Sequence, residues 1–374
     1  MASFFLTPFF VYETEEAMLA DPDIDVVLIA TPNDCHKPIA IRAMHAGKNV
    51  ISEKPVTLSS TDLLEMENAA KETGKLLTVH QNRRWDDDFL IIKKLVEDGV
   101  VDGWDDPRLV SIAALRRRGF TPESIKKFVD LCGVSKANSS VDYAMLEYCI
   151  REDLKMKKSR MMAVLDPVKV VIDNYPEGQT EYLDVVNNLE NEALGVRKIP
   201  FSRELYIERE DFMEEPPKKY FRMFPGNEVR LMNAYFVTCN SFEKDENGNV
   251  TVIHCTYDPA SRGGNSPDGR KVKGTIHWVS AAHAVPATVR LYENIVDEEK
   301  GVYNEDGSLN LNPNSLTVLK NCMVEENLAG AKAYDSFQFV RQGFFCVDAK
   351  DSTPEQLVFN RIVSLKSSFK LPTA

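Results

Sequence analysis

Residues 93–108 read KKLVEDGVVDGWDDPR, and the pattern of the sequence changes within this stretch. Before it, short runs of β-branched apolar residues alternate with segments of helical periodicity. After it come several helical segments, and then many short segments in which apolar and polar residues alternate. Because these two patterns are typical of different fold classes, we predict a chain of several domains with a boundary near residue 99.

The overall composition is that of a globular protein. At 374 residues the chain is long enough for two or three domains, and its apolar and charged fractions of 43% and 27% are ordinary. No run of 18 apolar residues occurs, and the apolar opening MASFFLTPFFVY lacks the basic residues of a secretory signal, so no membrane partner is expected. The seven cysteines have no CxxC spacing and the six histidines form no close pair, which predicts core cysteines, a cytoplasmic protein and no metal site.

The net charge of −12 argues only weakly against a nucleic-acid partner, because binding depends on where positive charge is placed. Most of the acidic excess lies in the first 99 residues, and the remainder is nearly balanced. Three basic stretches are candidate surface patches: LRRRG (115–119), LKMKKSR (154–160) and GRKVKG (269–274).

The first part reads as strands and helices in alternation. Apolar runs at 25–30, 49–55 and 76–85 are each followed by a helical segment, which predicts a parallel, doubly wound sheet. Ligands of such sheets bind where the strands end. The residues at these ends include Pro32, Asn33, Glu53, Lys54, His80 and Asn82, together with Thr31, Pro55 and Gln81.

The motifs ATPND, AGKNVISEKP and VHQNRRW occur here in that order, and the segment from about Val11 to Gly99 resembles the Gfo/Idh/MocA family of NAD(P)-dependent oxidoreductases. The resemblance implies a truncated Rossmann-like domain over 1–99, in which the first six of the residues just named are remnants of a cofactor site and Lys54 lies beside the nicotinamide. The family's GxGxxG turn, which holds the pyrophosphate, does not occur. We therefore expect no NAD(P) binding, and we expect the strand at 25–30 to present an unpaired apolar edge.

The second part begins with helical segments at about 104–160, in which Ser and Thr stand at capping positions. From about Met161, alternating segments are separated by turn signals such as ENGN and SPDGR. This spacing predicts two antiparallel β-barrels. The predicted strands are AVLDPVKVVIDN, KIPFSRELYIE, NEVRLMNAYFVTC, NVTVIHCTYD, KVKGTIHWVS, ATVRLYENIV and FQFVRQGFFCVD.

Long stretches such as GWDDPRLVSIAALRRRGFTPESI, KVKGTIHWVSAAHAVPATVRLY and QFVRQGFFCVD resemble the C-terminal half of glutaminyl-tRNA synthetases, from about Lys93 to Lys366. The resemblance implies a helical stem-contact region over 100–160 and anticodon-binding barrels over 161–374, with the anticodon loop of a glutamine tRNA as partner. Arg and Gln suit that task because they donate hydrogen bonds to base edges and phosphates. The residues implied to contact anticodon nucleotides are Arg160, Arg222, Gln338 and Arg341.

Two details qualify this expectation. Gln338 and Arg341 share a face only if a bulge or turn intervenes, because strand side chains alternate with period two. Phe221 and Met232 stand where relatives often carry basic residues near the first anticodon base, so reading of that base is expected to be looser or different.

The sequence also lacks features of a complete enzyme. No HIGH-type sequence occurs, and LKMKKSR reads as the charged end of a helix rather than as a KMSKS loop, so neither ATP binding nor aminoacylation is expected and no catalytic residue is predicted. KKLVEDG is compatible with both families, which suggests a chimera joined within it by recombination, gene-model error or construction. An NAD(P)-linked oxidoreductase and a fusion without function remain the alternatives, and the oligomeric state is not predicted.

Overall fold

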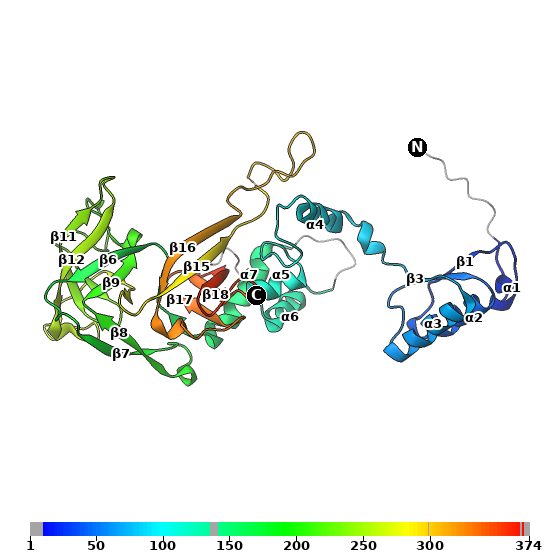
Figure 1. Cartoon of the computed structure of the whole chain (residues 1–374), viewed down its shortest axis with the longest axis horizontal. Helices are drawn as coiled ribbons and strands as arrows, with labels where there is room; N and C mark the ends of the chain where they lie inside the picture. Colours follow the sequence, from blue (N-terminus) through cyan, green and yellow to red (C-terminus); the bar gives the residue numbers. More distant parts are fainter. Residues whose placement is uncertain (1–9, 135–140, 298, 367–368, 370–374) are drawn as a thin grey trace. The chain divides into compact units, whose positions relative to one another are not determined.

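The computed structural model describes residues 10–134, 141–297, 299–366 and 369. The chain divides into two compact units, Met1–Asp98 and Gly99–Ala374 (Figure 1). The boundary lies inside the stretch where the sequence pattern changes.

The first unit is built around a small parallel sheet in the order β1-β2-β3. Its elements are α1 (Glu15–Leu19), β1 (Val26–Ile29), η1 (Asn33–Cys35), α2 (His36–His45), β2 (Asn49–Ser52), α3 (Ser60–Thr73), β3 (Leu77–Val79), η2 (Asn82–Trp85) and α4 (Asp87–Glu97). The predicted Rossmann-like parallel sheet is confirmed. The third strand is shorter than predicted, because the chain turns into η2 after His80.

Local sequence explains where these elements begin and end. The side chain of Ser59 caps α3 by accepting from the backbone N–H of Asp62 at 3.1 Å, and Gly74 ends the helix in the left-handed conformation. Buried residues of α2, including Ala40 and Met44, pack with β1 and α3 in one core cluster.

Strand β1 lies at the edge of its sheet, where β2 is its only partner among the described residues. Val27 and Ile29 join the core, but Val26 and Leu28 are 48% and 56% exposed. The predicted apolar edge at 25–30 is therefore present, and in the part of the chain described one face of β1 is covered by helices while the other is not.

The second unit opens with three helices, α5 (Ile112–Arg118), α6 (Pro122–Cys132) and α7 (Tyr143–Lys157). Ser111, Thr121 and Asp142 cap them in turn. Their apolar faces pack on β18 and β19. The LRRRG stretch is not a surface patch as predicted, because Arg117 and Arg118 are buried. Arg117 donates to Asp348, which is fully buried.

Two seven-stranded sheets follow, together with a separate two-stranded ribbon. The first sheet has the order β13-β10-β11-β12-β6-β9-β14, the second β4-β17-β18-β19-β15-β16-β5, and the ribbon β7-β8. The strands are β4 (Arg160–Met161), β5 (Ala163–Val164), β6 (Pro167–Ile172), β7 (Thr180–Val186), β8 (Val196–Ser202), β9 (Glu204–Glu208), β10 (Glu228–Leu231), β11 (Phe236–Lys244), β12 (Val250–Asp258), β13 (Thr275–Ile276), β14 (Val279–Ser280), β15 (Val285–Tyr292), β16 (Leu316–Val324), β17 (Ser336–Phe339), β18 (Gly343–Val347) and β19 (Leu357–Ser364). Short 3₁₀ turns are η3 (Glu192–Leu194), η4 (Arg209–Asp211), η5 (Pro259–Ser261) and η6 (Glu326–Leu328).

Both sheets share one pairing pattern. Read in the orders given, successive pairings are parallel, antiparallel, antiparallel, parallel, antiparallel and antiparallel in each sheet. The prediction was two antiparallel β-barrels: two curled or barrel-like sheets are confirmed, but neither is wholly antiparallel, because each contains two parallel pairings. The first surrounds a core that contains Phe201, Tyr235 and Trp278. The second packs Phe339, Phe345 and Phe359 together.

Four strands were absent from the sequence prediction, namely β4, β7, β16 and β19. The predicted strand at 271–280 is instead two short strands, β13 and β14, at opposite edges of the first sheet. The chain passes between the sheets at two places: β5 belongs to the second sheet and β6 to the first, and β14 belongs to the first and β15 to the second.

Candidate functional site

A buried carboxylate joins two of the four predicted arginine and glutamine positions. Asp211 has no exposed surface and follows β9 in the turn η4. Arg341, from the second sheet, donates to both of its oxygens at 2.6 and 2.8 Å. Arg222, from the segment between η4 and β10, reaches Asp211 at 3.0 Å. The two guanidinium groups, which keep 25% and 38% of their side-chain surface exposed, therefore meet on one anchor.

The backbone turn at Arg341 is what brings this side chain to the junction. Strand β17 ends at Phe339 and β18 begins at Gly343, and Arg341 has a φ of 67° in the turn between them. The turn that strand periodicity requires between Gln338 and Arg341 is therefore present. Because positive φ is uncommon for a residue with a side chain, the turn is held by its surroundings.

Two further buried groups complete the junction. His277 is fully buried; its Nδ1 lies 3.3 Å from a guanidinium nitrogen of Arg341, and its Nε2 lies 2.9 Å from the carbonyl oxygen of Ala163. Since arginine can only donate, Nδ1 accepts and Nε2 carries the proton. Glu208 accepts from Gln342 and from the backbone N–H of Leu165, at 2.8 Å each.

Charge at this junction is stabilised despite burial. Burial disfavours the charged form of Arg341, but its hydrogen bonds to Asp211 raise the pKa above the ordinary value for arginine. Burial also disfavours the carboxylate of Glu208, yet hydrogen bonds from His277 and from the backbone hold its pKa below the ordinary value. At the junction, the guanidinium group of Arg341 is therefore held in place by a buried carboxylate, and both groups are charged.

The other two predicted residues form a second pair. Arg160 and Gln338 are register partners in the parallel strands β4 and β17. Arg160 donates to Glu190 at 2.9 Å, and its Nε is buried without a hydrogen-bond partner in the part of the chain described. Both side chains are half-buried. Arg160 and Gln338 are thus adjacent, and Arg341 follows Gln338 by three positions along the chain.

Sequence reasoning missed Asp211, Glu208 and His277. Asp211 and Arg341 are 130 positions apart, so no local pattern links them. A buried carboxylate must be paired, but the local sequence does not reveal which carboxylates are buried. Of the two residues noted as departures, Phe221 is 49% exposed and Met232 packs against the core of the first sheet.

In the first unit, three of the six expected residues meet. Glu53 lies 2.7 Å from Nδ1 of His80 and 3.5 Å from Nζ of Lys54, at the ends of β2 and β3. The hydrogen bond from His80, followed by that from the backbone of Lys54, lowers the pKa of Glu53. Pro32 and Asn33 lie exposed where η1 begins, and Asn82 begins η2. His36, which was not predicted, is buried and bridges the carbonyl oxygens of Thr31 and Pro55 at 2.9 Å each.

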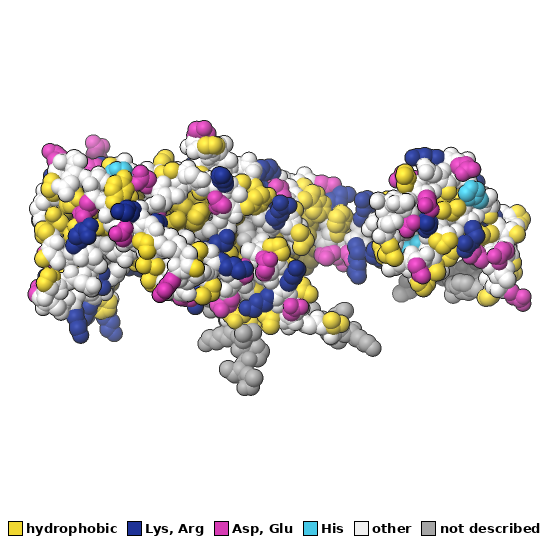
Figure 2. Space-filling model, turned by 90° about the horizontal axis from the view of Figure 1, so that it is seen from below, with side chains coloured by type: hydrophobic (Ala, Val, Ile, Leu, Met, Phe, Trp, Pro, Cys, Tyr) yellow, Lys and Arg dark blue, Asp and Glu magenta, His cyan; other side chains and the backbone are white. Residues whose placement is uncertain are grey.

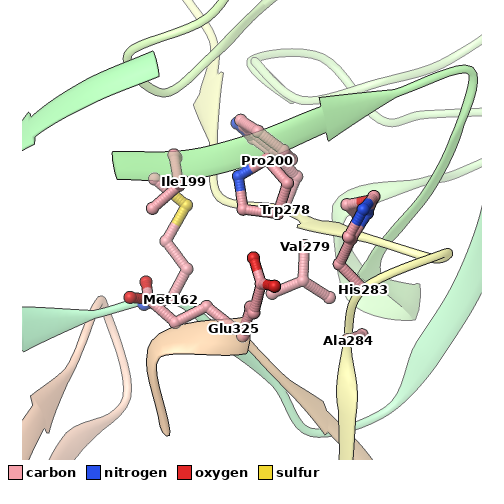
Figure 3. A pocket seen from close by; sticks show the side chains of 10 residues that line it. Met162, Ile199, Pro200, Trp278, Val279, His283, Ala284 and Glu325 are labelled. Atoms are coloured by element: carbon pink, nitrogen blue, oxygen red, sulfur yellow. The ribbon is translucent and has the colours of Figure 1, made fainter. Parts of the chain in front are cut away.

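The remaining cavities, side-chain groups and surfaces of the described residues provide no further candidate site at this point. A cavity of about 10 Å³ beside Trp278, with the carboxylate of Glu325 pointing into it, is no larger than a water molecule needs (Figure 3). Within the described ranges, no three His, Cys, Asp or Glu residues are grouped as metal ligands. In the same ranges, no helix has the length and apolar character to cross a membrane. On the face seen in Figure 2, Lys and Arg are interspersed with Asp and Glu.

Most of the second unit matches models of one known protein family. The two models for the "tRNA synthetases class I (E and Q), anti-codon binding domain" match residues 159–258 and 275–348. The catalytic-domain model of the same synthetases matches residues 91–156. Residues 91–348 belong to this synthetase family.

Relatives of the synthetase region are glutamine–tRNA ligases. One from Clostridium kluyveri is 56% identical over 283 residues, which cover 75% of this chain and 51% of that protein. One from Bradyrhizobium diazoefficiens is 52% identical over 279 residues, with coverages of 75% and 50%. The chain therefore spans about half the length of these relatives.

The first unit matches a different family. The model "Oxidoreductase family, NAD-binding Rossmann fold" matches residues 2–81. Among solved structures, the WlbA dehydrogenase of Bordetella pertussis in complex with NADH and UDP-GlcNAcA is 36% identical over 24% of this chain and 25% of that one, with a TM-score of 0.22. A superposition this limited supports no conclusion. The chain thus combines segments of two families.

Proposed function

We propose that the second unit binds the anticodon loop of a glutamine tRNA. The observation that carries this proposal is the pair Arg222 and Arg341, which come from the segment before β10 and from the turn between β17 and β18 and are both held by Asp211. Exposed faces of fixed guanidinium groups can donate paired hydrogen bonds to the edges of unstacked bases. The similarity to glutamine–tRNA ligases supports glutamine as the identity of the tRNA.

We infer that binding is not accompanied by aminoacylation. The sequence has no HIGH-type or KMSKS-type motif, and the cationic segment LKMKKSR is the end of α7 followed by β4. Affinity should be modest, because a loop alone offers few phosphates to neutralise.

We also propose that the first unit holds no dinucleotide. No glycine occurs before Gly47, so residues 1–46 lack the glycine-rich sequence that lets a backbone approach a pyrophosphate. The Glu53, Lys54 and His80 side chains pair with one another instead. The residues present therefore do not fit NAD(P).

The test is fluorescence anisotropy of the full chain with a labelled glutamine-tRNA anticodon stem-loop and with a loop altered at its middle base, each at two salt concentrations. We expect tighter binding of the native loop. Arg341→Ala should weaken it about 10- to 100-fold and reduce the preference between loops. Arg83→Ala, which removes an arginine that is 80% exposed on the first unit, is the matched control and should bind as wild type.

Equal, salt-sensitive binding of both loops would contradict base recognition and leave only general electrostatic attraction. Absence of binding to either loop would contradict the proposed function itself.

A further inference from the structure

A second polar and aromatic pocket lies beside Arg222 and takes no part in the junction at Asp211. Its volume is about 410 Å³, and the residues that matter for its chemistry are Tyr220, Phe221, Phe224, Lys271, Lys273 and Gly274. We call it the Phe221 pocket. One wall is the segment that leads into β10, and the other is the end of the basic stretch GRKVKG.

Phe221 lines the pocket with a partly exposed aromatic ring, one face of which lies under Lys273. Phe221 is 49% exposed, and the ammonium group of Lys273 lies 5.2 Å from the centre of its ring. The rings of Tyr220 and Phe224 lie 6.5 Å apart and tilted on the same wall. Burial, and then the charge of Asp211, raise the pKa of Tyr220 to about 12, so its phenol is neutral at physiological pH.

The two walls are fixed against each other by backbone contacts. A Cβ atom at residue 274 would lie 2.1 Å from the carbonyl oxygen of Phe221, so only glycine permits this approach. The carbonyl oxygen of Gly274 also accepts from the backbone N–H of Arg230 at 2.8 Å. On the opposite wall, the amide of Asn227 donates to the carbonyl oxygen of Arg222 at 2.7 Å.

Charge in the Phe221 pocket is available to an anion. The carboxylate of Glu228, which lines it, is engaged by two guanidinium nitrogens of Arg270 at 2.9 Å each. Lys271 and Lys273 form no ion pair within the described residues. An exposed ring flanked by cations is the arrangement that binds unpaired nucleotides, because the base stacks on the ring and the phosphate meets the ammonium groups.

We propose that the Phe221 pocket binds one unpaired nucleobase by stacking on Phe221, with Lys271 and Lys273 contacting its phosphates. This inference rests on the proposed function. Phe221 and Arg222 are neighbours in the chain, so one RNA strand bound to the arginine pair passes beside the Phe221 pocket. Stacking on Phe221 would add to the hydrogen bonds from the arginine pair, and it would not depend on the identity of the base.

The test is a double-mutant cycle, in which stem-loop affinity is measured for a change at Phe221, for the removal of one RNA base, and for both changes together. Phe221→Leu keeps an apolar side chain but removes the ring, and it should weaken stem-loop binding about tenfold. Loops with a single abasic position, scanned one position at a time, identify the stacked base: at that position Phe221→Leu should have no further effect. Phe221→Trp should restore binding, and Tyr303→Leu, at another exposed aromatic residue (57% exposed), should bind as wild type.

Lys273→Gln provides an independent measurement. It should weaken binding of all loops to a similar degree and lower the slope of log Kd against log salt by about one. Thermal unfolding of the Phe221 and Lys273 variants should match wild type, because both side chains are partly exposed.

The outcomes separate the two proposals. If Phe221→Leu binds as wild type while Arg341→Ala weakens binding, the Phe221 pocket does not hold a base and the anticodon function stands. If Phe221→Leu weakens every abasic loop by the same factor, the ring acts on protein structure rather than on a base, and the inference fails. If the wild-type chain binds no stem-loop, both proposals fail.

Discussion

Asp211 illustrates how a single buried charge can organise a surface. A carboxylate without exposed surface is costly unless it is paired, and here arginines from two distant connecting segments, Arg222 and Arg341, supply the pairing. The same contacts fix the position of both guanidinium groups, each of which keeps part of its surface exposed. In the proposed function, Asp211 therefore acts by positioning Arg222 and Arg341 rather than by contacting RNA.

We predict that Asp211→Asn weakens binding of the native stem-loop about tenfold and narrows its preference over the loop with an altered middle base. The amide keeps the shape of the carboxylate but cannot bind both arginines as a charged acceptor. Anisotropy with both loops measures the effect. Asp166→Asn, at a carboxylate that is 67% exposed, is the control; an unchanged ratio of the two affinities in Asp211→Asn would refute the positioning role.

Local sequence predicted the helices well, and the reason is visible at individual residues. Caps such as Ser59, Ser111 and Thr121 and the apolar spacing around them are local signals, so these helices begin where the pattern indicates. The strands that escaped prediction depend on distant partners. In β16, for example, Met323 pairs with Val164, and no short window records that pairing.

The residues of the candidate site likewise fall into those that the sequence predicted and those that it did not. Arg160, Arg222, Gln338 and Arg341 were found through long resemblance to a family, and the structure brings them together as two pairs. The residues that hold the junction, Asp211, Glu208 and His277, carry no motif. Their importance follows from burial, which the sequence around each of them does not specify.

Gly119 shows how one element depends on close packing. It ends α5 with a φ of 107°, and a Cβ there would lie 2.6 Å from the Cβ of Cys346 and 2.8 Å from the Cδ1 of Ile362. We predict that Gly119→Ala lowers the free energy of unfolding by about 2–4 kcal/mol, since both strain and overpacking oppose it.

Gly133 is the matched control for this prediction. It ends α6 with a φ of 66°, and a Cβ atom there would meet nothing within 4 Å among the described residues. Gly133→Ala should therefore lose no packing, and backbone strain alone, at φ 66° and ψ −170°, should cost about 1–3 kcal/mol. Urea unfolding of both variants measures the difference, and equal losses would show that packing at Gly119 is unimportant.

At the scale of the whole molecule, the two units differ in how completely their sheets are covered. Strand β1 is an edge strand with Val26 and Leu28 about half exposed, whereas the sheets of the second unit enclose extended cores. An uncovered apolar edge is a template for association between chains.

We predict that Leu28→Lys reduces aggregation of the full chain, because a charge on the edge opposes strand addition. Leu58→Lys, at a residue that is 69% exposed and outside any strand, makes the same chemical change and should have a smaller effect. Light scattering during concentration and heating compares the variants. Equal improvement in both would mean that net charge, not the edge, governs solubility.

The passage of the chain between the two sheets has a consequence for synthesis. On the ribosome, β4 and β5 emerge before any strand of the first sheet, yet their partners β17 and β16 emerge only after that sheet is complete. Translation must therefore deliver nearly the entire polypeptide before the second sheet can close and bring Arg341 to Asp211. The nascent chain acquires its arginine pair last, so premature termination after β14 but before β17 yields a complete first sheet without the half of the site that Arg341 provides.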